Sequence, residues 1–425
     1  MSTISFADVV HHSVSFNREI PYQALVLDLI DTPWMQRLRE ISQTANTRLL
    51  YMFSEHSRFG HSVGVGFLAC QLIDKLLCHS PAEVAPWAPV VSAAALLHDI
   101  GHLAPGSHIA LRAWFPQIQA SHEALAARIV TQDEGLRSLL SRYDPTYPKK
   151  VAAVLMESPA VPPWTWEIIS GGGWNVDRGN WCVVDSILGG VSYGRYNIPA
   201  LTESIVLTSD GHLALQESRL DAMMHFAISR HAMYRQVYQH RVLLAIDTII
   251  KAIAQRAREL GPRLGFADAH MQAVLNAAQP EDLELETIFW LREAWWRYHI
   301  YQWQHDRDPI LADLAARLIN RRLFKTFRVY PEDNEAQLVE RSKLILRELG
   351  YDPNYYLHKV STSDMLSGDT DQSMRVQLSN GELRTLPEAD PFFNALMCEY
   401  KPSTRSWLTL PAEAKQRLEE EFRRR

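Results

Sequence analysis

Cysteine is scarce in this chain of 425 residues, and the way it is distributed excludes several classes of protein. The four cysteines form no CxxC pair and are too sparse for a disulfide scaffold, so we expect free thiols and a cytoplasmic, reducing location. No apolar run approaches the roughly 20 residues that are needed to span a bilayer. The N-terminus has no continuous apolar stretch behind basic residues, so we expect neither a membrane segment nor a secretory signal.

A large excess of charge of one sign is also missing. The net charge is −6, which excludes wholesale coating of nucleic acid, and we expect that no nucleic-acid partner is required. The hydrophobic content of 47% is ordinary for a globular protein that buries a core. Histidine stands out instead, because seven of the 17 histidines fall between His56 and His122. This clustering fits either a metal and phosphate site or helix packing with polar edges.

Apolar residues recur at helical spacing over most of the chain. The pattern predicts a short helix from Pro33, a buried helix over 60–77, a central helix over 90–97, and a helix around 178–191. From 217 to 256 there is no glycine or proline, so we expect one long helix there. At about 1.5 Å per residue, that helix would be roughly 55–60 Å long.

The strand signals are few and short. Residues 203–216 predict a β-hairpin whose two strands flank Asp210 and Gly211, the preferred pair for a type I′ turn. Residues 355–386 predict a small β element, and the chain ends in an amphipathic, charged helix. We therefore expect a mainly α fold with a large helical domain over 1–326 and a smaller α+β appendage over 327–425.

The strongest local signal is the motif LLHDIGH over 96–102. His98 and Asp99 stand at the end of an apolar helix, where burying both is costly unless a charge compensates. A divalent cation does so, because neutral imidazole and carboxylate are among its natural ligands. The alternative is a capped helix end with a hydrogen-bonded His–Asp pair. His61, in the motif RFGHSVG, lies near the start of another buried helix, where a lone histidine is more often a satisfied core residue.

With these residues in place, the sequence resembles the HD-domain superfamily of metal-dependent phosphohydrolases. Within it, the chain is similar to the deoxynucleoside triphosphate triphosphohydrolases, which include bacterial dGTPases and the vertebrate HD-domain dNTPase. The motifs that carry the resemblance follow the family's order over residues 30–326: DTPWMQRLREISQ, HSRFGHSVGVGFLA, LLHDIGH, SHEALA, NVDRGNWCVVDS, SRHAMYRQVYQHR and RRLFK.

The resemblance implies an HD-domain helical bundle and a metal held by His61, His98, Asp99 and Asp177. Asp177 is chosen by the family pattern alone, and its alternative role is a helix N-cap. A set of two nitrogen and two oxygen ligands suits manganese, iron or magnesium, and we expect one of these in preference to zinc.

The reaction implied by the family is hydrolysis of a deoxynucleoside triphosphate to a deoxynucleoside and inorganic triphosphate, with water attacking the α-phosphorus. Arg58 and Arg178 take positions that resemble phosphate-contacting positions. His102, His108 and His122 are the candidates for transferring a proton to the leaving group.

The resemblance also implies a nucleotide pocket and its regulation. Gln43 matches a residue near the sugar, Asp185 one that binds the 3′-hydroxyl, and Tyr238 one that packs on the sugar and excludes a 2′-hydroxyl. Alternatively, Gln43 is an exposed helix residue and Tyr238 takes part in ordinary core packing. Relatives form homo-oligomers, tetramers or hexamers, with nucleotide effectors between subunits. Arg321 and Lys325 match an effector-binding segment, or else form a solvated basic helix end.

Several positions depart from the family pattern. Asn180, Trp181 and Val184 replace the usual aspartate, tyrosine and arginine, and Thr44 replaces a leucine. These changes leave the metal set intact but bear on base choice and sugar discrimination. They keep two alternatives open: an HD-type phosphohydrolase that acts on another nucleotide phosphoester, and a nucleotide-sensing protein with weak catalysis.

Overall fold

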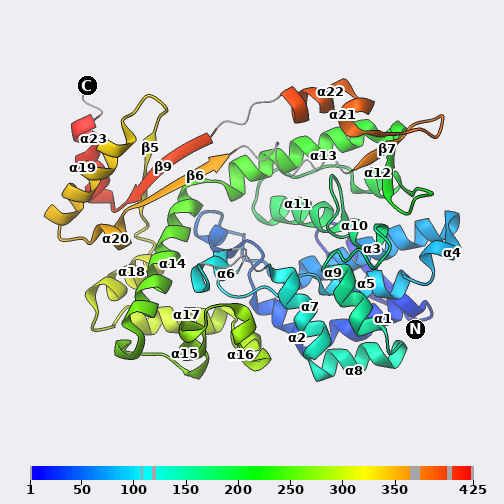
Figure 1. Cartoon of the computed structure of the whole chain (residues 1–425), viewed down its shortest axis with the longest axis horizontal. Helices are drawn as coiled ribbons and strands as arrows, with labels where there is room; N and C mark the ends of the chain where they lie inside the picture. Colours follow the sequence, from blue (N-terminus) through cyan, green and yellow to red (C-terminus); the bar gives the residue numbers. More distant parts are fainter. Residues whose placement is uncertain (1, 107–108, 117–120, 364–373, 400–403, 423–425) are drawn as a thin grey trace.

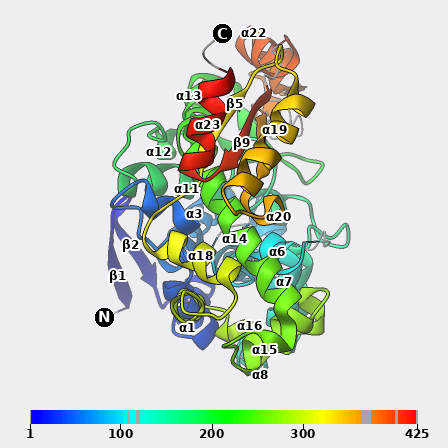
Figure 2. The same cartoon turned by 90° about the vertical axis from the view of Figure 1, so that its left-hand side faces the viewer.

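The fold is mainly α, as the sequence predicts. The computed structural model describes residues 2–106, 109–116, 121–363, 374–399 and 404–422. Figures 1 and 2 show a body of packed helices, with short strands at its edges.

Helix α5 (Ala88–Leu97) lies at the centre of this body and is apolar on all sides. It packs against α1 (Pro21–Ile30), α3 (Arg58–His79) and α9 (Tyr147–Leu155). The helices predicted over 60–77 and 90–97 are therefore confirmed. By length and composition α3 could cross a membrane, but 67% of its apolar window is buried inside the molecule, as expected of a core helix.

Further helices surround this centre. Those of the N-terminal half are α2 (Pro33–Arg37), α4 (Pro81–Val84), α6 (Ile109–Trp114), α7 (His122–Gln132), α8 (Glu134–Tyr143), α10 (Trp164–Glu167), α11 (Val176–Leu188) and α12 (Ile198–Thr202). Those of the C-terminal half, beside the long pair described next, are α15 (Ala269–Asn276), α16 (Leu285–Trp290), α17 (Glu293–Trp303), α18 (Pro309–Ile319), α19 (Glu335–Glu348), α20 (Pro353–Tyr356), α21 (Leu386–Ala389), α22 (Pro391–Asn394) and α23 (Ala412–Phe422).

The single long helix predicted over 217–256 is wrong. The chain forms α13 (Leu220–Met233), a π-helical turn (Tyr234–Tyr238) and then α14 (Arg241–Leu260). His240 adopts an extended backbone, and its side chain accepts a hydrogen bond from the Val242 N–H, so it caps α14. A side-chain cap can end and restart a helix without glycine or proline. The break allows α14 to run between the C-terminal sheet and α6 (Figures 1 and 2).

The strands of the described residues form three small sheets. Strands β1 (Thr3–Asp8) and β2 (His12–Asn17) form an N-terminal antiparallel hairpin. Strands β3 (Ile205–Leu207) and β4 (Leu213–Gln216) form the hairpin predicted over 203–216. Its turn is not type I′, because only Gly211 of the central pair has a positive φ, at 82°, whereas that turn requires two.

The C-terminal quarter of the chain is divided between two places (Figure 1). Strand β9 (Thr404–Leu410) lies between β5 (Lys325–Val329) and β6 (His358–Ser363), and α23 packs against β5 and α19. Strands β7 (Arg375–Gln377) and β8 (Leu383–Thr385) instead extend the core hairpin, with β7 parallel to β4. The domain boundary at 326/327 stays a prediction, since β5 and the β4–β7 pairing both cross it.

Candidate metal and nucleotide site

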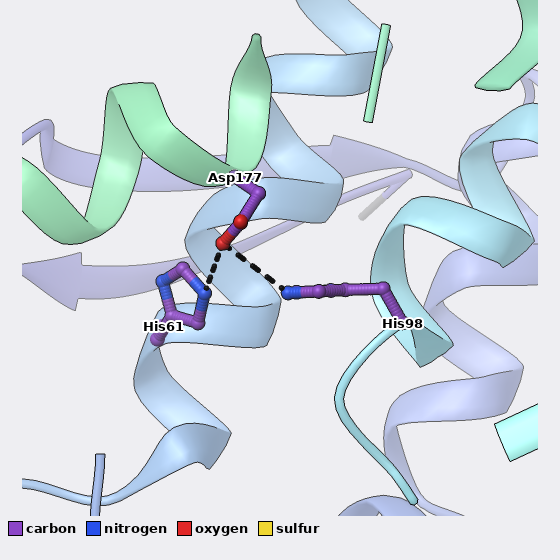
Figure 3. A group of neighbouring side chains, drawn as sticks. All are labelled: His61, His98 and Asp177. Carbon is purple, nitrogen blue, oxygen red and sulfur yellow. Dashed lines mark hydrogen bonds and ion pairs between the residues drawn. The ribbon is translucent and has the colours of Figure 1, made fainter. Parts of the chain in front are cut away.

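Three helix ends place the four predicted metal ligands together. His61 lies in the first turn of α3, and His98 and Asp99 directly follow the last residue of α5. Asp177 lies in the first turn of α11, and the side chain of Asn175 caps that helix by accepting a hydrogen bond from the Arg178 N–H. Since Asn175 fills the capping role, the carboxylate of Asp177 is left to face the two histidines (Figure 3).

The distances between the ligand atoms match those around a single ion. Asp177 Oδ1 lies 3.0 Å from His61 Nε2 and 3.5 Å from His98 Nε2 (Figure 3). Asp99 approaches the same imidazoles, at 3.4 Å from His98 Nε2 and 3.7 Å from His61 Nε2. With metal–ligand bonds of about 2.0–2.2 Å, neighbouring ligand atoms are about 3–3.6 Å apart. His61, His98 and Asp177 form a group whose atoms could hold one cation, and Asp99 lies beside this group as the predicted fourth ligand.

The hydrogen bonds of His98 leave one ring nitrogen free for such a cation. His98 Nδ1 lies 2.8 Å from the carbonyl oxygen of Ala95, which can only accept, so this nitrogen carries the proton. His98 Nε2 is buried and has no hydrogen-bond partner among the described residues. A buried nitrogen lone pair that faces two carboxylates fits a divalent ion, which favours such mixed nitrogen and oxygen ligands.

The charges of the site also favour a cation. Burial opposes a charged imidazole at His98, but the carboxylates of Asp99 and Asp177 outweigh it and raise its pKa to about 9. Burial would likewise raise the pKa of Asp177, yet the hydrogen bond to His61 and the nearby imidazole of His98 hold the pKa well below the usual range. Both shifts have the same cause, the attraction between the imidazoles and the carboxylates, and a metal ion would take the place of the imidazole protons between them.

Asp99 is shared with a second pair of histidines. Its Oδ1 lies 3.2 Å from His102 Nε2 and 3.9 Å from His122 Nε2, and the two rings stack with centroids 3.9 Å apart. Asp99, His102 and His122 form a second group whose atoms could hold an ion. Burial, followed by the charge of Arg58, lowers the pKa of His102 well below its ordinary value, and burial also lowers that of His122. Both histidines are therefore neutral near pH 7.

Arg58 and Gln43 form the next part of the site. Arg58 Nη1 donates to Asp99 Oδ2 at 2.6 Å, and Nη2 donates to the backbone oxygen of Gln43 at 3.3 Å. Arg58 thus orients Asp99 in addition to lining the cavity. Gln43 is buried, and its side-chain oxygen has no donor among the described residues. A ligand with an N–H or O–H group would satisfy that oxygen.

Asp185 is held by two side chains. Its Oδ1 lies 2.7 Å from His56 Nε2, and its Oδ2 accepts a hydrogen bond from the hydroxyl group of Tyr238. The π-helical turn before α14 brings Tyr238 to this position. The rings of Trp181 and Tyr234 pack edge to face against Tyr238, with centroids 5.5 Å and 5.3 Å away. The result is an aromatic wall beside a carboxylate, which suits the stacking and hydroxyl contacts of a nucleoside.

A cavity of about 880 Å³ joins these features. This volume lies in the range of small-molecule binding sites, about 300–1,000 Å³. The predicted residues that line the cavity are Gln43, Arg58, His98, Asp99, His102, His122, Asp177, Arg178, Asp185 and Tyr238. His61 is buried behind them, with 1% of its surface exposed.

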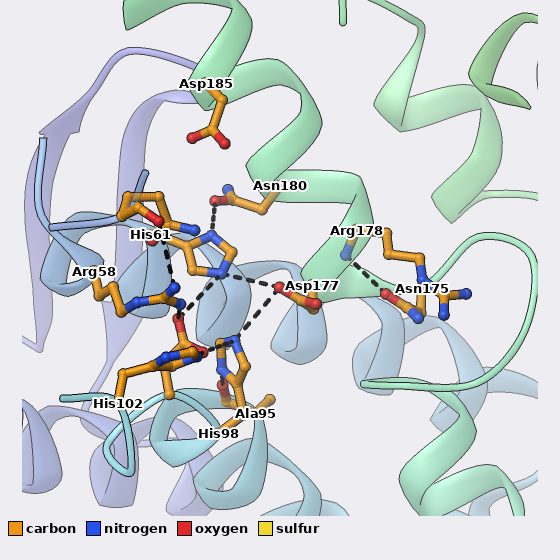
Figure 4. Close-up of polar contacts among 12 residues, drawn as sticks. Arg58, His61, Ala95, His98, His102, Asn175, Asp177, Arg178, Asn180 and Asp185 are labelled. Atoms are coloured by element: carbon orange, nitrogen blue, oxygen red, sulfur yellow. Dashed lines mark hydrogen bonds and ion pairs between the residues drawn. The ribbon is translucent and has the colours of Figure 1, made fainter. Parts of the chain in front are cut away.

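Other predicted residues lie elsewhere or point elsewhere. Arg178 borders the cavity, but its Nη1 donates to the carbonyl oxygens of Gly171 and Gly173, as Figure 4 shows by its direction away from the histidines. Arg321 and Lys325 are exposed and do not line the cavity, and Arg321 Nε donates to the carbonyl oxygen of Leu49. His108 lies outside the described residues.

Several residues of the site were not predicted from the sequence. His56 precedes the motif RFGHSVG by two residues, so its position along the chain was a usable signal. Asn180 was noted only as a departure from the family, although its Oδ1 lies 2.9 Å from His61 Nδ1. Arg112 and Asp247 line the cavity from α6 and α14, and no spacing in the sequence indicates them.

Known proteins resemble this chain in sequence and in fold. The family model of the HD domain matches residues 58–156, which contain the first three predicted ligands. An uncharacterized protein of Bacillus subtilis, YwfO, is 30% identical over 392 residues, which cover 90% of this chain and 86% of that protein. The deoxynucleoside triphosphate triphosphohydrolase SAMHD1 of Danio rerio is 25% identical over 281 residues. That match covers 58% of this chain and 43% of the fish protein, so the chain spans less than half of that relative.

Solved structures share the fold. A phosphohydrolase from Bacteroides thetaiotaomicron superposes with a TM-score of 0.81 over 96% of this chain and 99% of the other, at 23% identity. A hypothetical protein from Aquifex aeolicus superposes with a TM-score of 0.74 over 99% of both chains, at 21% identity. These two structures show the shared fold. The HD-domain match and the relative that aligns over nearly its whole length show that the chain belongs to the HD-domain phosphohydrolase family.

Proposed function

We propose that the protein hydrolyses deoxynucleoside triphosphates, with a divalent metal ion, to a deoxynucleoside and inorganic triphosphate. The observation that carries the proposal is the convergence of two imidazoles and two carboxylates at one end of a cavity whose wall also presents Asp185 and Tyr238. The similarity to SAMHD1 triphosphohydrolases supports the choice of substrate.

His61, His98, Asp99 and Asp177 would hold the metal, and manganese, iron and magnesium all fit this ligand set. When bound, such an ion polarises a phosphoryl oxygen and makes water more acidic. The oxygen of water attacks the α-phosphorus, the bond from that phosphorus to the 5′-oxygen breaks, and the 5′-oxygen takes up a proton. The residues of the chain position these groups and transfer the proton.

The cationic side chains around the cavity serve the phosphates. Arg58 is buried beside Asp99, and Arg112 is exposed on α6 at the cavity wall. Guanidinium groups pair with phosphate oxygens through two hydrogen bonds, which suits a triphosphate. On the opposite wall, Asp185 would accept a hydrogen bond from the 3′-hydroxyl group, and the Tyr238 ring would pack on the deoxyribose.

A histidine near the metal ligands must supply the proton to the 5′-oxygen. His102 and His122 are neutral near pH 7 because burial lowers the pKa of each. A neutral imidazole can still relay a proton, by receiving one at one nitrogen while it donates from the other. His122 Nε2 lies 3.2 Å from Glu123 Oε1, and Glu123 also lines the cavity. We assign the relay to His122 with Glu123.

The test is an assay of products. Purified protein is incubated with Mn²⁺, Mg²⁺ or Fe²⁺ and each deoxynucleoside triphosphate, each ribonucleoside triphosphate and mixtures of both, and the products are separated by chromatography. We expect deoxynucleoside and triphosphate. Monophosphate or orthophosphate would instead indicate an HD-type phosphohydrolase with another substrate, and nucleotide binding without turnover would indicate a sensor.

Asp177→Asn separates the site from general damage. Asp177 is about one-third exposed and holds no buried arginine, so the variant is expected to fold. We expect at least a hundredfold loss of activity together with loss of bound metal. Glu134→Gln, an exposed carboxylate on α8, is the matched control and should leave both unchanged. Full activity of Asp177→Asn would refute the ligand assignment. Asp99→Ala should also abolish both, but it additionally leaves Arg58 without its partner.

A further inference from the structure

The N-terminal hairpin reaches the support of the predicted metal ligands. Asn180 is fully buried on α11, and its side-chain oxygen lies 2.9 Å from His61 Nδ1 (Figure 4). Its side-chain nitrogen lies 3.4 Å from Nε2 of His11, which stands in the turn between β1 and β2. A single amide group therefore connects a predicted metal ligand with a residue about 50 positions earlier in the chain.

The chemistry of the amide fixes the proton of His61. An amide oxygen only accepts a hydrogen bond and an amide nitrogen only donates. His61 Nδ1 must therefore carry a proton. This leaves Nε2, which lies 3.0 Å from Asp177 Oδ1, as the nitrogen that would bind a metal ion once the ion displaces its proton. A ligand histidine commonly has its other nitrogen held in this way, and the loss of such a partner weakens metal affinity by about 10–100-fold.

The surroundings hold the two partners of the amide in place. Asp8 Oδ1 accepts hydrogen bonds from the backbone N–H groups of Val10 and His11, which shapes the turn. The His11 ring packs edge to face on Phe67 of α3, with centroids 5.2 Å apart. Burial lowers the pKa of His11, although the charge of Asp8 opposes this. A neutral His11 can accept the hydrogen bond that Asn180 donates.

A glycine on α3 leaves room for the amide. A Cβ atom at Gly64 would lie 2.4 Å from the Asn180 side-chain nitrogen and 3.1 Å from its Cγ. At Gly60, one turn earlier in the same helix, a Cβ atom would meet nothing within 4 Å. The two glycines therefore form a matched pair, in which only Gly64 is required by the position of Asn180.

We propose that Asn180 is a positioning residue for His61, and that His11 holds Asn180, so that the N-terminal hairpin supports the metal centre. This inference rests on the proposed metal site. It deepens that proposal, because neither the ligand motifs nor the HD-domain match, which begins at residue 58, includes the hairpin.

The experiment measures Mn²⁺ affinity of the full-length protein by calorimetry, with folding checked by circular dichroism. Asn180→Leu, which keeps the volume and removes the acceptor, should weaken binding 10–100-fold. Asn180→Asp keeps the acceptor and should stay within a few-fold of the wild type. Gly64→Ala should weaken binding like Asn180→Leu, whereas Gly60→Ala should not. Equal affinities for the two alanine variants, or an unchanged affinity of Asn180→Leu, would overturn the role of Asn180.

The hairpin link is tested separately. His11→Phe keeps the ring on Phe67 but removes the acceptor, and we expect Mn²⁺ affinity to fall by about 3–10-fold. The matched control is His12→Asn, since His12, the next residue and the first of β2, is exposed and its positive φ of 61° is tolerated by asparagine. The double variant of Asn180→Leu with His11→Phe should bind no more weakly than Asn180→Leu alone, because both act through one contact. Full additivity, or no effect of His11→Phe, would remove the hairpin from the proposal.

A second readout needs no metal. In ¹⁵N-histidine NMR spectra of the metal-free protein, the proton on His61 Nδ1 should be protected from exchange in the wild type and lost in Asn180→Leu. Equal protection in the two proteins would overturn the inference. If the wild type binds no Mn²⁺ but shows this protected proton, then the metal site fails while the contact between Asn180 and His61 stands.

Discussion

Asp247 places a carboxyl group on the cavity wall, far along the chain from the metal ligands. It lies on α14 and is partly buried, and burial raises its pKa to about 7, although the charge of Lys251 opposes the shift. No side chain among the described residues donates a hydrogen bond to it. A carboxyl group of this kind changes charge near neutral pH, at a place where a triphosphate would add negative charge.

Asp247→Asn should change how stability depends on pH. Because the folded-state pKa is raised above the ordinary value of an aspartate, the folded protein keeps this proton to a higher pH than the unfolded chain does. The favourable contribution is present below about pH 4 and is lost as the pH rises towards 7. Asparagine does not ionise, so the variant does not lose stability in this way as the pH rises. Its free energy of unfolding at pH 8 should therefore exceed that of the wild type by on the order of 2 kcal/mol.

Urea denaturation at pH 5 and pH 8 measures the effect. The difference between Asp247→Asn and the wild type should be smaller at pH 5 than at pH 8. The control is Glu281→Gln, which removes an exposed carboxylate and should show no such pH dependence. Asp306 is less suitable as a control, because its carboxylate accepts a hydrogen bond from the Gly265 N–H. Equal differences at both pH values would mean that the Asp247 carboxyl group has an ordinary pKa.

At the scale of elements, Arg37 connects the loop that follows His98 and Asp99 with the end of α16. Its guanidinium group donates to the carbonyl oxygens of Ile100 and His102 and to those of residues 288, 289 and 291, near the end of α16. Arg37 is 1% exposed, and burial lowers its pKa to about 9. Within the part of the chain that the structure describes, its hydrogen bonds all go to backbone carbonyl oxygens, so the position of the loop depends on this side chain.

Arg37→Met should destabilise the protein by about 3 kcal/mol or more, because several buried carbonyl oxygens lose their donor. The loop that carries His102 should also lose its position, so activity should fall more than metal affinity. Thermal denaturation and Mn²⁺ titration measure the two effects. The exposed Arg39→Met, in the same segment, should change stability by under about 1 kcal/mol. A similar loss in both variants would show that the buried contacts of Arg37 are not what matters.

The elements that sequence analysis predicted well are those with a complete local signal. The helix containing Val90 to Leu97 is apolar on all sides, and the structure buries it at the centre. The long helix over 217–256 was wrong because its break comes from His240, whose side chain caps α14, and histidine is no common breaker. The turn at Gly211 was assigned to the wrong type, because the preference of a residue pair does not fix the backbone angles.

The residues of the site also differ in whether the sequence around them carries a signal. The motifs around His61 and His98 predicted ligands because each combines ligand-type residues with a buried helix end, and the structure brings them together. Asp177 needed the family pattern, since one acid among many carries no local signal. His11 could not be predicted, because its contact with Asn180 is made between segments 169 residues apart and leaves no spacing to recognise.

At the scale of the whole molecule, regulation and assembly remain proposals. We propose that the protein forms a homo-oligomer and that Arg321 and Lys325 contact a nucleotide effector. Both side chains are exposed and lie outside the cavity, as an effector site between subunits requires. Mass photometry with and without deoxynucleoside triphosphates should show a larger species with nucleotide. Arg321→Glu with Lys325→Glu should prevent this change and leave basal activity within about twofold, since charge reversal repels phosphate. An unchanged response would indicate a solvated basic helix end.

The C-terminal quarter of the chain bears on a different prediction, the boundary at 326/327. Strand β7 pairs with β4 through residues 375–377, and Arg375 forms an ion pair with Asp210 at 2.8 Å. Strand β5 contains residues on both sides of the boundary, and it packs together with β6 and β9 on α14, whose other contacts reach α6. Val376, in the middle of β7, is fully buried. Removal of the segment would therefore expose the edge of the core hairpin and one side of α14.

We expect that a chain ending at residue 326 does not fold as a stable unit. The lost strand pairing leaves β4 with unpaired backbone groups, which promotes aggregation, and the buried faces of α14 and β4 lose their apolar cover. Size-exclusion chromatography and thermal denaturation of the shortened chain should show aggregates and no cooperative transition. Val376→Asp in the intact chain should reproduce part of the loss, because it buries a charge in the same sheet, whereas Arg384→Ala on the exposed face of β8 should not. A shortened chain that unfolds cooperatively and keeps its metal affinity would make the segment a separate appendage, since α14 and the hairpin would then be stable without it.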